Sequence, residues 1–208
     1  YNLLKTKYWT LCLKISGFKS LFLMHFLHIS KKDHVLVADI PLDGSKSISN
    51  RALIMQALAG EARKTISGLS RSKDTVTLQH LLQQEGDVFN AGDAGTTFRF
   101  LTAYLAIQPG TQILDGSERM RERPVGGLVE ALRVLGADIA CLGREGFPPL
   151  RIGPAKQPVS NQPAQISVAG TTSSQFVSAL LMIGPYLPGG LELTLSGGLV
   201  SRPYVEMT

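Results

Sequence analysis

Hydroxyl groups and cations gather at three glycine-containing loops of this 208-residue chain. The loops are residues 44–51 (GSKSISNR), 94–99 (AGTTFR) and 169–175 (AGTTSSQ), and each leads into an apolar, helix-like stretch. A loop that opens a helix offers unpaired N–H groups, hydroxyl donors and the positive end of the helix dipole, which suit a phosphate or a carboxylate. Helix capping is the competing interpretation of any one loop, but three such loops favour anion binding. Their cations are Lys46, Arg51 and Arg99.

Three further arginines follow the second loop, at positions 119, 121 and 123. The planar guanidinium group suits bidentate capture of a phosphate or a carboxylate. For Arg119 and Arg121 a solvated surface is an equally good interpretation, because runs of charge usually face water. Pro124 is typical of the first position of a helix, so we predict that Arg123 lies at a helix entrance beside the anion loops.

Other binding motifs are incomplete. The string from Gly44 to Ser47 contains part of a nucleotide-binding P-loop, but Asp39 and Ile40 stand where its earlier glycine should be. No GxGxxG dinucleotide fingerprint occurs, and the four histidines show no zinc-ligand spacing. We therefore expect no metal site.

The net charge of +5 comes from the N-terminal region. Residues 1–33 contain six lysines and one aspartate, so residues 34–208 carry no net charge and lack the basic surface that nucleic acid requires. Two lysines interrupt the apolar stretch 8–29 and no cleavage site follows it, which argues against a membrane span or an export signal. We expect residues 1–33 to be a disordered extension outside the fold, with Met24 as the natural start and an upstream leader or a poorly ordered tail before it.

The elements that position the loops also repeat. Each loop is followed by an apolar helix, a Gly or Pro turn and a short strand that ends at a glycine. A second helix, with leucines at helical spacing, ends at a glycine suited to a left-handed cap and leads into another strand. This alternation predicts an α/β fold. The expected helices are 52–59, 78–86, 100–106, 128–136 and 176–183, and the expected strands are 65–68, 112–116 and 191–197.

Five segments, in order from about Val35 to Thr208, resemble the signatures of the 5-enolpyruvylshikimate-3-phosphate synthase (EPSP synthase) family. They are residues 44–52, 94–99, 119–124, 173–176 and 201–204. The resemblance implies an enzyme that transfers the enolpyruvyl group of phosphoenolpyruvate to the 5-hydroxyl of shikimate 3-phosphate, with no metal or organic cofactor. It also implies two inverted α/β barrel domains of repeated βαβαββ units, with the active site between them. Residues 34–208 would be the first domain, truncated within the third repeat, and the second domain would be absent.

The resemblance also implies site residues, position by position. Lys46 would be the catalytic residue and would contact both substrates. The residues that would bind phosphoenolpyruvate are Lys46, Gly95, Arg123 and Gln175. The residues that would bind shikimate 3-phosphate are Lys46, Ser47, Arg51, Ser173, Ser174, Gln175, Ser201 and Tyr204. Within this set, the Ser173–Ser174 pair would hold the phosphate and Tyr204 would pack against the ring.

Two carboxylates depart from the family pattern. Asp43 stands before Gly-Ser-Lys, where proline is more common, and Asp93 stands before Ala-Gly-Thr, where asparagine is common. A carboxylate beside an anion loop would repel the ligand unless it is paired or turned away.

The family's acid and base carboxylates belong to the second domain, so we expect this chain alone not to turn over. We expect the full-length protein to be a cytoplasmic monomer, with Cys12 and Cys141 as reduced thiols. Other functions stay open at this point: a non-catalytic anion-binding domain, one subunit of a split enzyme, or a UDP-N-acetylglucosamine enolpyruvyltransferase.

Overall fold

The computed structural model describes residues 39, 41–60, 65–153, 162–169, 171–198 and 201–208. The chain divides into two units, residues 1–41 and residues 42–208, and all the described helices and strands belong to the second unit. The expected N-terminal extension, with Met24 and Cys12, lies outside the described residues.

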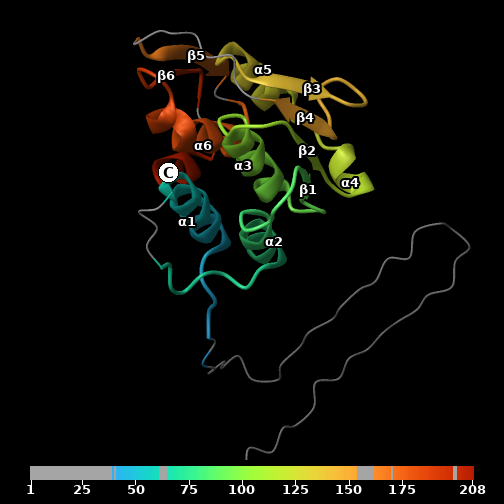
Figure 1. The fold of residues 1–208 in the computed structure, drawn as a ribbon. Coiled ribbons are helices and arrows are strands. Elements are labelled where there is room, and N and C mark those ends of the chain that lie inside the picture. The colour runs from blue at the N-terminus through green and yellow to red at the C-terminus, as the bar shows by residue number, and fades with distance from the viewer. Residues whose placement is uncertain (1–38, 40, 61–64, 154–161, 170, 199–200) are drawn as a thin grey trace, which may run out of the picture. The chain divides into compact units, whose positions relative to one another are not determined.

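Serine side chains begin four of the helices. The N-caps of α1, α2, α4 and α6 are Ser45, Ser72, Ser117 and Ser173, and each hydroxyl accepts a hydrogen bond from a first-turn N–H group. The helices are α1 (Lys46–Leu58), α2 (Lys73–Leu81), α3 (Gly95–Leu105), α4 (Glu118–Arg121), α5 (Gly126–Val134), α6 (Ser174–Ile183) and α7 (Arg202–Glu206), with a 3-10 turn η2 at Gly184–Tyr186. Figure 1 labels most of them.

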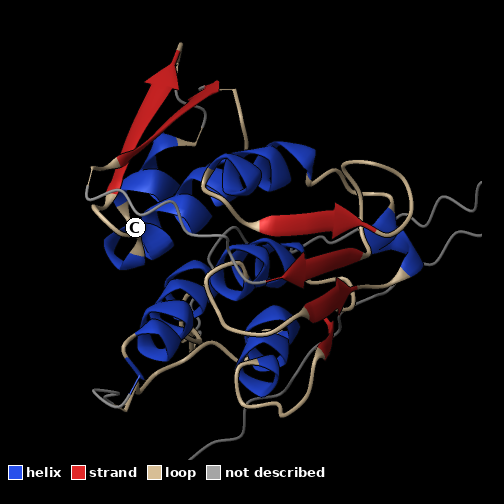
Figure 2. Ribbon diagram, turned by 45° about the horizontal axis from the view of Figure 1, so that its top comes forward, coloured by secondary structure: helices blue, strands red, loops and turns tan. Residues whose placement is uncertain are grey.

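The strands form two sheets, which Figure 2 shows in red. The larger sheet has the order β1-β2-β4-β3, with β1 parallel to β2 and the other neighbours antiparallel. In the smaller sheet, β5 and β6 are parallel and pair along their whole lengths. The strands are β1 (Val88–Asn90), β2 (Gln112–Asp115), β3 (Asp138–Cys141), β4 (Leu150–Gly153), β5 (Ala164–Ala169) and β6 (Leu191–Ser196).

Helices connect both parallel pairs. Helix α3 connects β1 to β2 and α6 connects β5 to β6, as parallel strands require a crossover between them. From β1 to β4 the chain runs strand, helix, strand, two helices, strand, strand. The structure therefore confirms the α/β class that the sequence predicts.

The larger sheet buries one face. Its register places Phe89, Leu114 and Leu150 side by side, and all three are buried in the core that α3 and α5 share. On the other face, Val88 and Arg151 are exposed or half-exposed. Burial of a single face is common where a sheet contains antiparallel strands, and it fixes which way β1 to β4 turn toward the helices.

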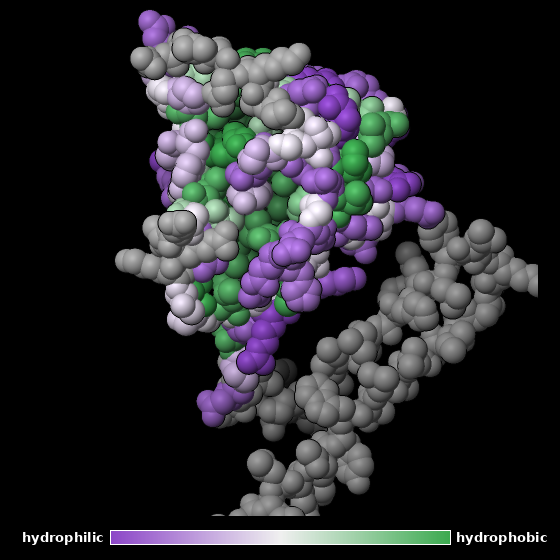
Figure 3. All heavy atoms as spheres, in the orientation of Figure 1, coloured by the Kyte–Doolittle hydropathy of each residue, from purple (hydrophilic) through white to green (hydrophobic). Residues whose placement is uncertain are grey.

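Helix α3 lies at the centre of the core, with Phe98 and Phe100 fully buried. It packs against α1, α2, α5 and α6. Each buried phenyl ring contributes roughly 2–3 kcal/mol through removal from water. Apolar side chains also reach the surface in places, as one face shows in Figure 3, and the most exposed of the large ones is Leu42.

Three local expectations need correction. Residues 65–68 do not form a strand; the segment turns at Gly68, which has a φ of +69°, and its backbone runs directly against Gly44. The helix expected from Pro124 begins two residues later, at Gly126. Helix α2 ends at Leu81, well before the expected glycine at position 86.

The glycine cap after α5 is present as expected. Gly136 has a φ of +91°, and the N–H groups of Gly136 and Ala137 donate to the carbonyls of Arg133 and Leu132. This pair of hydrogen bonds is the Schellman motif, which needs a residue in the left-handed region.

Candidate functional site

The first turns of α1, α2, α3 and α6 meet in one place through a series of side-chain contacts. Lys46 Nζ lies 3.1 Å from Asp74 Oδ2. The hydroxyl of Thr97 donates to the carbonyl of Asp74 at 2.8 Å, and Gln175 Nε2 donates to the hydroxyl of neighbouring Thr96 at 3.2 Å. The three loops that the sequence singles out therefore lie together, although 129 residues separate Lys46 from Gln175.

The first loop depends on Gly44. A Cβ atom on Gly44 would overlap the Gly68 carbonyl and lie 2.9 Å from the Ser70 nitrogen, so only glycine allows this close crossing. The N–H group of Ser70 donates to the hydroxyl of Ser49 at 2.9 Å and joins the crossing segment to α1. This arrangement leaves Lys46 exposed and Ser47 half-buried at the start of the helix.

The second loop brings two guanidinium groups together. Helix α3 begins after Ala94, which supplies no side-chain cap, so the N–H groups of its first turn stay open to a ligand. A Cβ atom on Gly95 would lie 2.8 Å from Arg123 Cζ and 2.8 Å from Arg99 Nη1. Arg99 also donates to the carbonyls of Gly95 (2.9 Å) and Pro124 (3.2 Å).

Neither of these guanidinium groups has a carboxylate partner in the described part of the chain. Arg99 is buried, and Arg123 is half-buried. Burial, followed by repulsion from Arg123, lowers the pKa of Arg99 to about 10. Arg99 is therefore still charged at neutral pH, and this end of α3 would attract an anion.

The third loop supplies hydroxyl and amide groups. Ser173 is the N-cap of α6, and its hydroxyl accepts from the N–H of Gln175 at 3.3 Å. Ser174 is the first helical residue and is half-buried. The ring of Phe176 lies against Arg99, with 5.5 Å from the guanidinium carbon to the ring centroid. The third loop therefore contacts the second loop twice, through Gln175 and Phe176.

Arg51 lies inside the protein, with 5% of its surface exposed. Its guanidinium donates to the Ser47 carbonyl, the Ser178 hydroxyl, the Tyr204 carbonyl and the Thr208 hydroxyl, at 2.7 to 2.9 Å. Burial is the main reason that its pKa is lowered from the ordinary value. In this structure Arg51 joins α1 to α6 and α7.

Helix α7 carries the two remaining expected residues. Ser201 is its N-cap and adopts a left-handed conformation, with φ of 59°. That conformation is uncommon for a residue with a side chain and is often found at functional sites. The Tyr204 side chain is 46% exposed, while its carbonyl accepts from Arg51.

Asp43 and Asp93, the two carboxylates that differ from the family pattern, each accept a hydrogen bond. The carboxylate of Asp43 accepts from the Arg71 N–H, and that of Asp93 accepts from the hydroxyl of Ser117. Arg121 is paired as well: two of its nitrogens contact the Asp115 carboxylate, at 3.0 and 2.5 Å. Arg121 is therefore a structural residue at the end of β2.

The sequence did not reveal the partners that hold these groups. Asp74 on Lys46, Phe176 on Arg99 and Thr208 on Arg51 were not expected. One sequence feature could have pointed to Asp74: it lies two residues after the Ser72 cap, in the first turn of a helix, as the residues of the three loops do. No such feature pointed to Thr208, since 157 residues separate it from Arg51.

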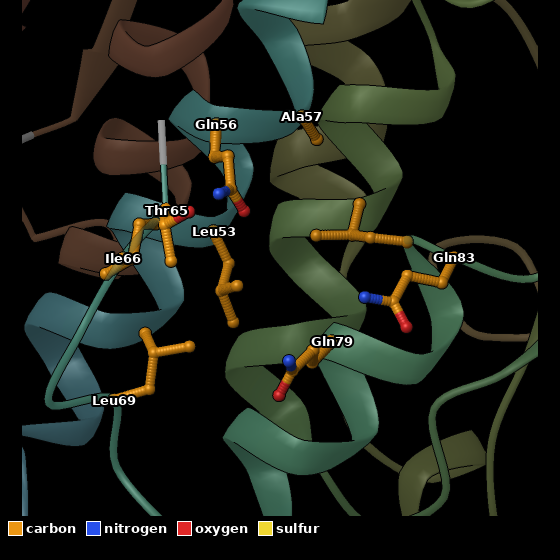
Figure 4. A pocket seen from close by; sticks show the side chains of 9 residues that line it. Leu53, Gln56, Ala57, Thr65, Ile66, Leu69, Gln79 and Gln83 are labelled. Carbon is orange, nitrogen blue, oxygen red and sulfur yellow. The ribbon is translucent and has the colours of Figure 1, made fainter. Parts of the chain in front are cut away.

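Two cavities lie outside this cluster of helix starts. One, of about 260 Å³, is lined by the C-terminal halves of α1 and α2 and by residues 65–69, with Gln56, Gln79 and Gln83 among its side chains (Figure 4). The other, of about 350 Å³, lies between α5 and β5. Neither lining includes a lysine or an arginine, so neither is suited to an anion.

The described residues contain no group of three or more His, Cys, Asp and Glu side chains placed to hold a metal ion. Within the same part of the chain, every helix is too short or too polar to cross a membrane. Cys141 is a free thiol.

Comparison with known proteins gives the family. The sequence model of the EPSP synthase family, described as EPSP synthase (3-phosphoshikimate 1-carboxyvinyltransferase), matches residues 31–87 and 77–208. The 3-phosphoshikimate 1-carboxyvinyltransferase of Bacteroides fragilis is 48% identical over 171 residues, covering 82% of this chain and 40% of that protein. The enzyme of the same name from Cellvibrio japonicus is 43% identical, covering 89% of this chain and 48% of that protein.

A solved structure agrees with these matches. EPSP synthase from Acinetobacter baumannii superimposes with a TM-score of 0.68 at 20% identity, covering 80% of this chain and 42% of that chain, which shows a shared fold. The chain thus spans less than half the length of these relatives. With a family match along most of its length and relatives more than 40% identical, this chain belongs to the EPSP synthase (3-phosphoshikimate 1-carboxyvinyltransferase) family.

Proposed function

We propose that this chain is part of an enzyme that moves the enolpyruvyl group of phosphoenolpyruvate onto the 5-hydroxyl of shikimate 3-phosphate. The observation that carries the proposal is the meeting of α1, α2, α3 and α6 at their first turns, where Lys46, Arg99 and Arg123 gather. Both substrates are polyanions, and this cluster offers cations, hydroxyls and open N–H groups. The names of the relatives support the same reaction.

Phosphoenolpyruvate would bind at the start of α3. Because Gly95 has no side chain, the Arg123 guanidinium can lie directly beside it. Gln175 reaches the same turn through Thr96, and Lys46 reaches its neighbourhood through Asp74 and Thr97. We assign these four residues, Lys46, Gly95, Arg123 and Gln175, to this substrate.

Shikimate 3-phosphate would bind beside it, across the starts of α1 and α6. Ser173 and Ser174 would hold its phosphate at the N-terminus of α6, an anion site by geometry. Its other ligands would be Lys46, Ser47, Arg51, Gln175, Ser201 and Tyr204. Arg51 is buried in this structure, so a direct contact with the substrate would require one of its present hydrogen bonds to be exchanged.

The reaction would proceed by addition and elimination. The 5-hydroxyl loses its proton as its oxygen forms a bond to C2 of phosphoenolpyruvate, and C3 gains a proton. The C2–O bond to phosphate then breaks as C3 loses a proton, and inorganic phosphate leaves. Lys46 would stabilise charge on the departing phosphate, and the remaining contribution would come from positioning and charge in a closed site. No metal or organic cofactor enters this scheme.

We further propose the larger organisation. Residues 34–208 would belong to the first of two domains, an inverted α/β barrel of βαβαββ units. The order from β1 to β4 supports such a unit. The complete protein would be a cytoplasmic monomer with its site between the domains, and with no nucleic acid or membrane partner.

Calorimetric titration of the folded chain with shikimate 3-phosphate tests the proposal. Unphosphorylated shikimate and UDP-N-acetylglucosamine serve as control ligands. We expect binding that needs the phosphate and that weakens about tenfold or more in Ser174→Ala, since a hydrogen bond to a charged group contributes about 1.5–3 kcal/mol. Ser167→Ala, the same change at an exposed position of β5, should bind normally.

The other outcomes distinguish the alternatives. Preference for UDP-N-acetylglucosamine would move the chain to the nucleotide-sugar enolpyruvyltransferases. Binding of both shikimate and its phosphate with equal affinity would contradict the assignment of Ser173 and Ser174. Binding of simple anions alone would favour a non-catalytic anion-binding domain.

A further inference from the structure

Arg99 is a buried charge to which the proposed function assigns no contact with either substrate. Only 6% of its surface is exposed, and no carboxylate pairs with it in the described part of the chain. Its Nε atom is buried without a hydrogen-bond partner among the same residues. An uncompensated buried charge is costly, so its presence needs a reason beyond packing.

The contacts of Arg99 fix two segments of the site to each other. One terminal nitrogen donates to the carbonyl of Gly95, in the first turn of α3, and the other donates to the carbonyl of Pro124, directly after Arg123. The backbone on both sides of the anion site is therefore tied to a single planar group. A guanidinium suits this task because its donors are rigidly arranged.

The ring of Phe176 lies against the guanidinium group of Arg99. Its ring centroid lies 5.5 Å from the guanidinium carbon of Arg99. On the other side the ring adjoins α5, since a Cβ atom on Gly127 would lie 3.5 Å from Phe176 Cε2. Arg99 is thus held by hydrogen bonds to two carbonyls and by contact with an aromatic ring.

Arg123 completes the arrangement. Its guanidinium reaches the space beside Gly95 that Arg99 also borders, and it makes no ion pair within the described residues. Two cations this close repel each other unless an anion lies between or beside them. Something must hold Arg123 there when the site is empty, and its own backbone is tied through Pro124 to Arg99.

We propose that Arg99, held by Phe176, is a positioning residue: it fixes the position of Arg123 relative to Gly95, so that both can contact phosphoenolpyruvate. This inference deepens the proposed function and rests on it. Arg99 acts through Arg123 and through the carbonyls it binds, not by contact with substrate. Affinity for phosphoenolpyruvate should therefore depend on the shape of Arg99 as well as on its charge.

The test measures phosphoenolpyruvate and shikimate 3-phosphate affinities separately in the whole chain, with inorganic phosphate as a second probe of the anion site. Arg99→Lys keeps the charge but loses the planar group that binds the carbonyls of Gly95 and Pro124 at the same time. We expect its phosphoenolpyruvate affinity to fall about tenfold or more and its shikimate 3-phosphate affinity to change less than about twofold. Phe176→Leu keeps an apolar side chain and leaves the charge of Arg99 in place. Its phosphoenolpyruvate affinity should also fall, but by a smaller factor.

A matched control is available in the hairpin between β3 and β4. Arg144 also lies over a phenyl ring, that of Phe147, with its guanidinium carbon 3.3 Å from the centroid, and within the described residues no hydrogen bond or ion pair joins its side chain to a helix start. Arg144→Lys should leave both affinities unchanged. Thermal unfolding of every variant identifies those that have lost structure.

Each outcome is decisive. A selective loss of phosphoenolpyruvate binding in Arg99→Lys and Phe176→Leu supports the inference. Equal affinities in wild type and variants, or parallel losses for both substrates that follow the unfolding temperature, overturn it and leave the proposed function intact. Wild-type chain that binds shikimate 3-phosphate but neither phosphoenolpyruvate nor phosphate also overturns it. Failure to bind any of these ligands would contradict the proposed function as well.

Discussion

Individual side chains at the helix starts fall into two groups with different neighbours. Arg51 and Arg121 have their donors occupied by protein groups, while Arg123 keeps its guanidinium free of carboxylates in the described part of the chain. Lys46 is intermediate, because its ion pair with Asp74 is half-exposed and so contributes little stability. The free or weakly held cations are the ones best placed to exchange their partners for a ligand.

Gly95→Ala tests the space at the start of α3. The atoms nearest to the new methyl group belong to the guanidinium of Arg123, followed by one nitrogen of Arg99, so Arg123 should move rather than the backbone. We expect phosphoenolpyruvate affinity to fall about tenfold or more, the loss of one charge-assisted contact. The unfolding free energy should change by less than about 1 kcal/mol, since alanine favours a helix.

Calorimetry and thermal unfolding measure the two quantities. Gly143→Ala is the matched control, because a Cβ atom there meets nothing within 4 Å. Unchanged phosphoenolpyruvate affinity in Gly95→Ala would show that Arg123 does not act at this position.

Single elements show how far sequence patterns reach. The apolar stretches after the three loops are helical as predicted, because capping and helical periodicity are local properties. The strand expected at residues 65–68 is wrong, because a strand needs a partner and this segment instead crosses over Gly44. The sequence also did not predict which cations near the helix starts lack a carboxylate partner in the described residues. The partners of Arg51 lie up to 157 residues away, a separation that no local pattern records.

The end of β2 is stabilised by a pair whose strength depends on pH. Hydrogen bonds from Arg121 are the main cause of a lowered pKa for Asp115, and the N–H of Gly116 adds to them. A carboxylate with a lowered folded-state pKa stabilises the fold above its ordinary pKa of about 4, and this contribution is lost as the pH falls through the lowered value.

We therefore expect Arg121→Gln to be slightly less stable than wild type at pH 7, because the arginine is exposed and water screens its ion pair with Asp115. Urea unfolding between pH 7 and pH 2 should show this difference shrinking toward zero at the acid end. Arg119→Gln, two residues away, should show no such trend. A difference that persists at pH 2 would mean that Arg121 stabilises the protein by packing.

At the scale of the whole molecule, we infer that the described chain holds one side of the proposed site. Its acidic side chains near the helix starts are engaged: Asp74 with Lys46, Asp43 with Arg71 and Asp93 with Ser117. An addition and elimination at C3 of phosphoenolpyruvate needs a group that gives and then removes a proton. The relatives are more than twice as long as the matched region, which leaves room for such groups elsewhere in them.

We predict that residues 1–208 alone bind substrate without turning it over. A phosphate-release assay with both substrates should stay at the uncatalysed rate, even at concentrations that saturate binding. Lys46→Ala provides the background control. Steady phosphate release that Lys46→Ala abolishes would contradict the prediction and place the proton-transfer groups within this chain.

The interior position of Arg51 has a consequence for how the chain matures. Two of the groups that accept its hydrogen bonds, the Tyr204 carbonyl and the Thr208 hydroxyl, belong to α7 and the residues after it. During synthesis α1 emerges from the ribosome long before them, and a guanidinium without acceptors resists burial. We therefore expect α1 to stay loosely docked on the nascent chain until α7 has been made, because the hydrogen bonds of Arg51 join these two helices.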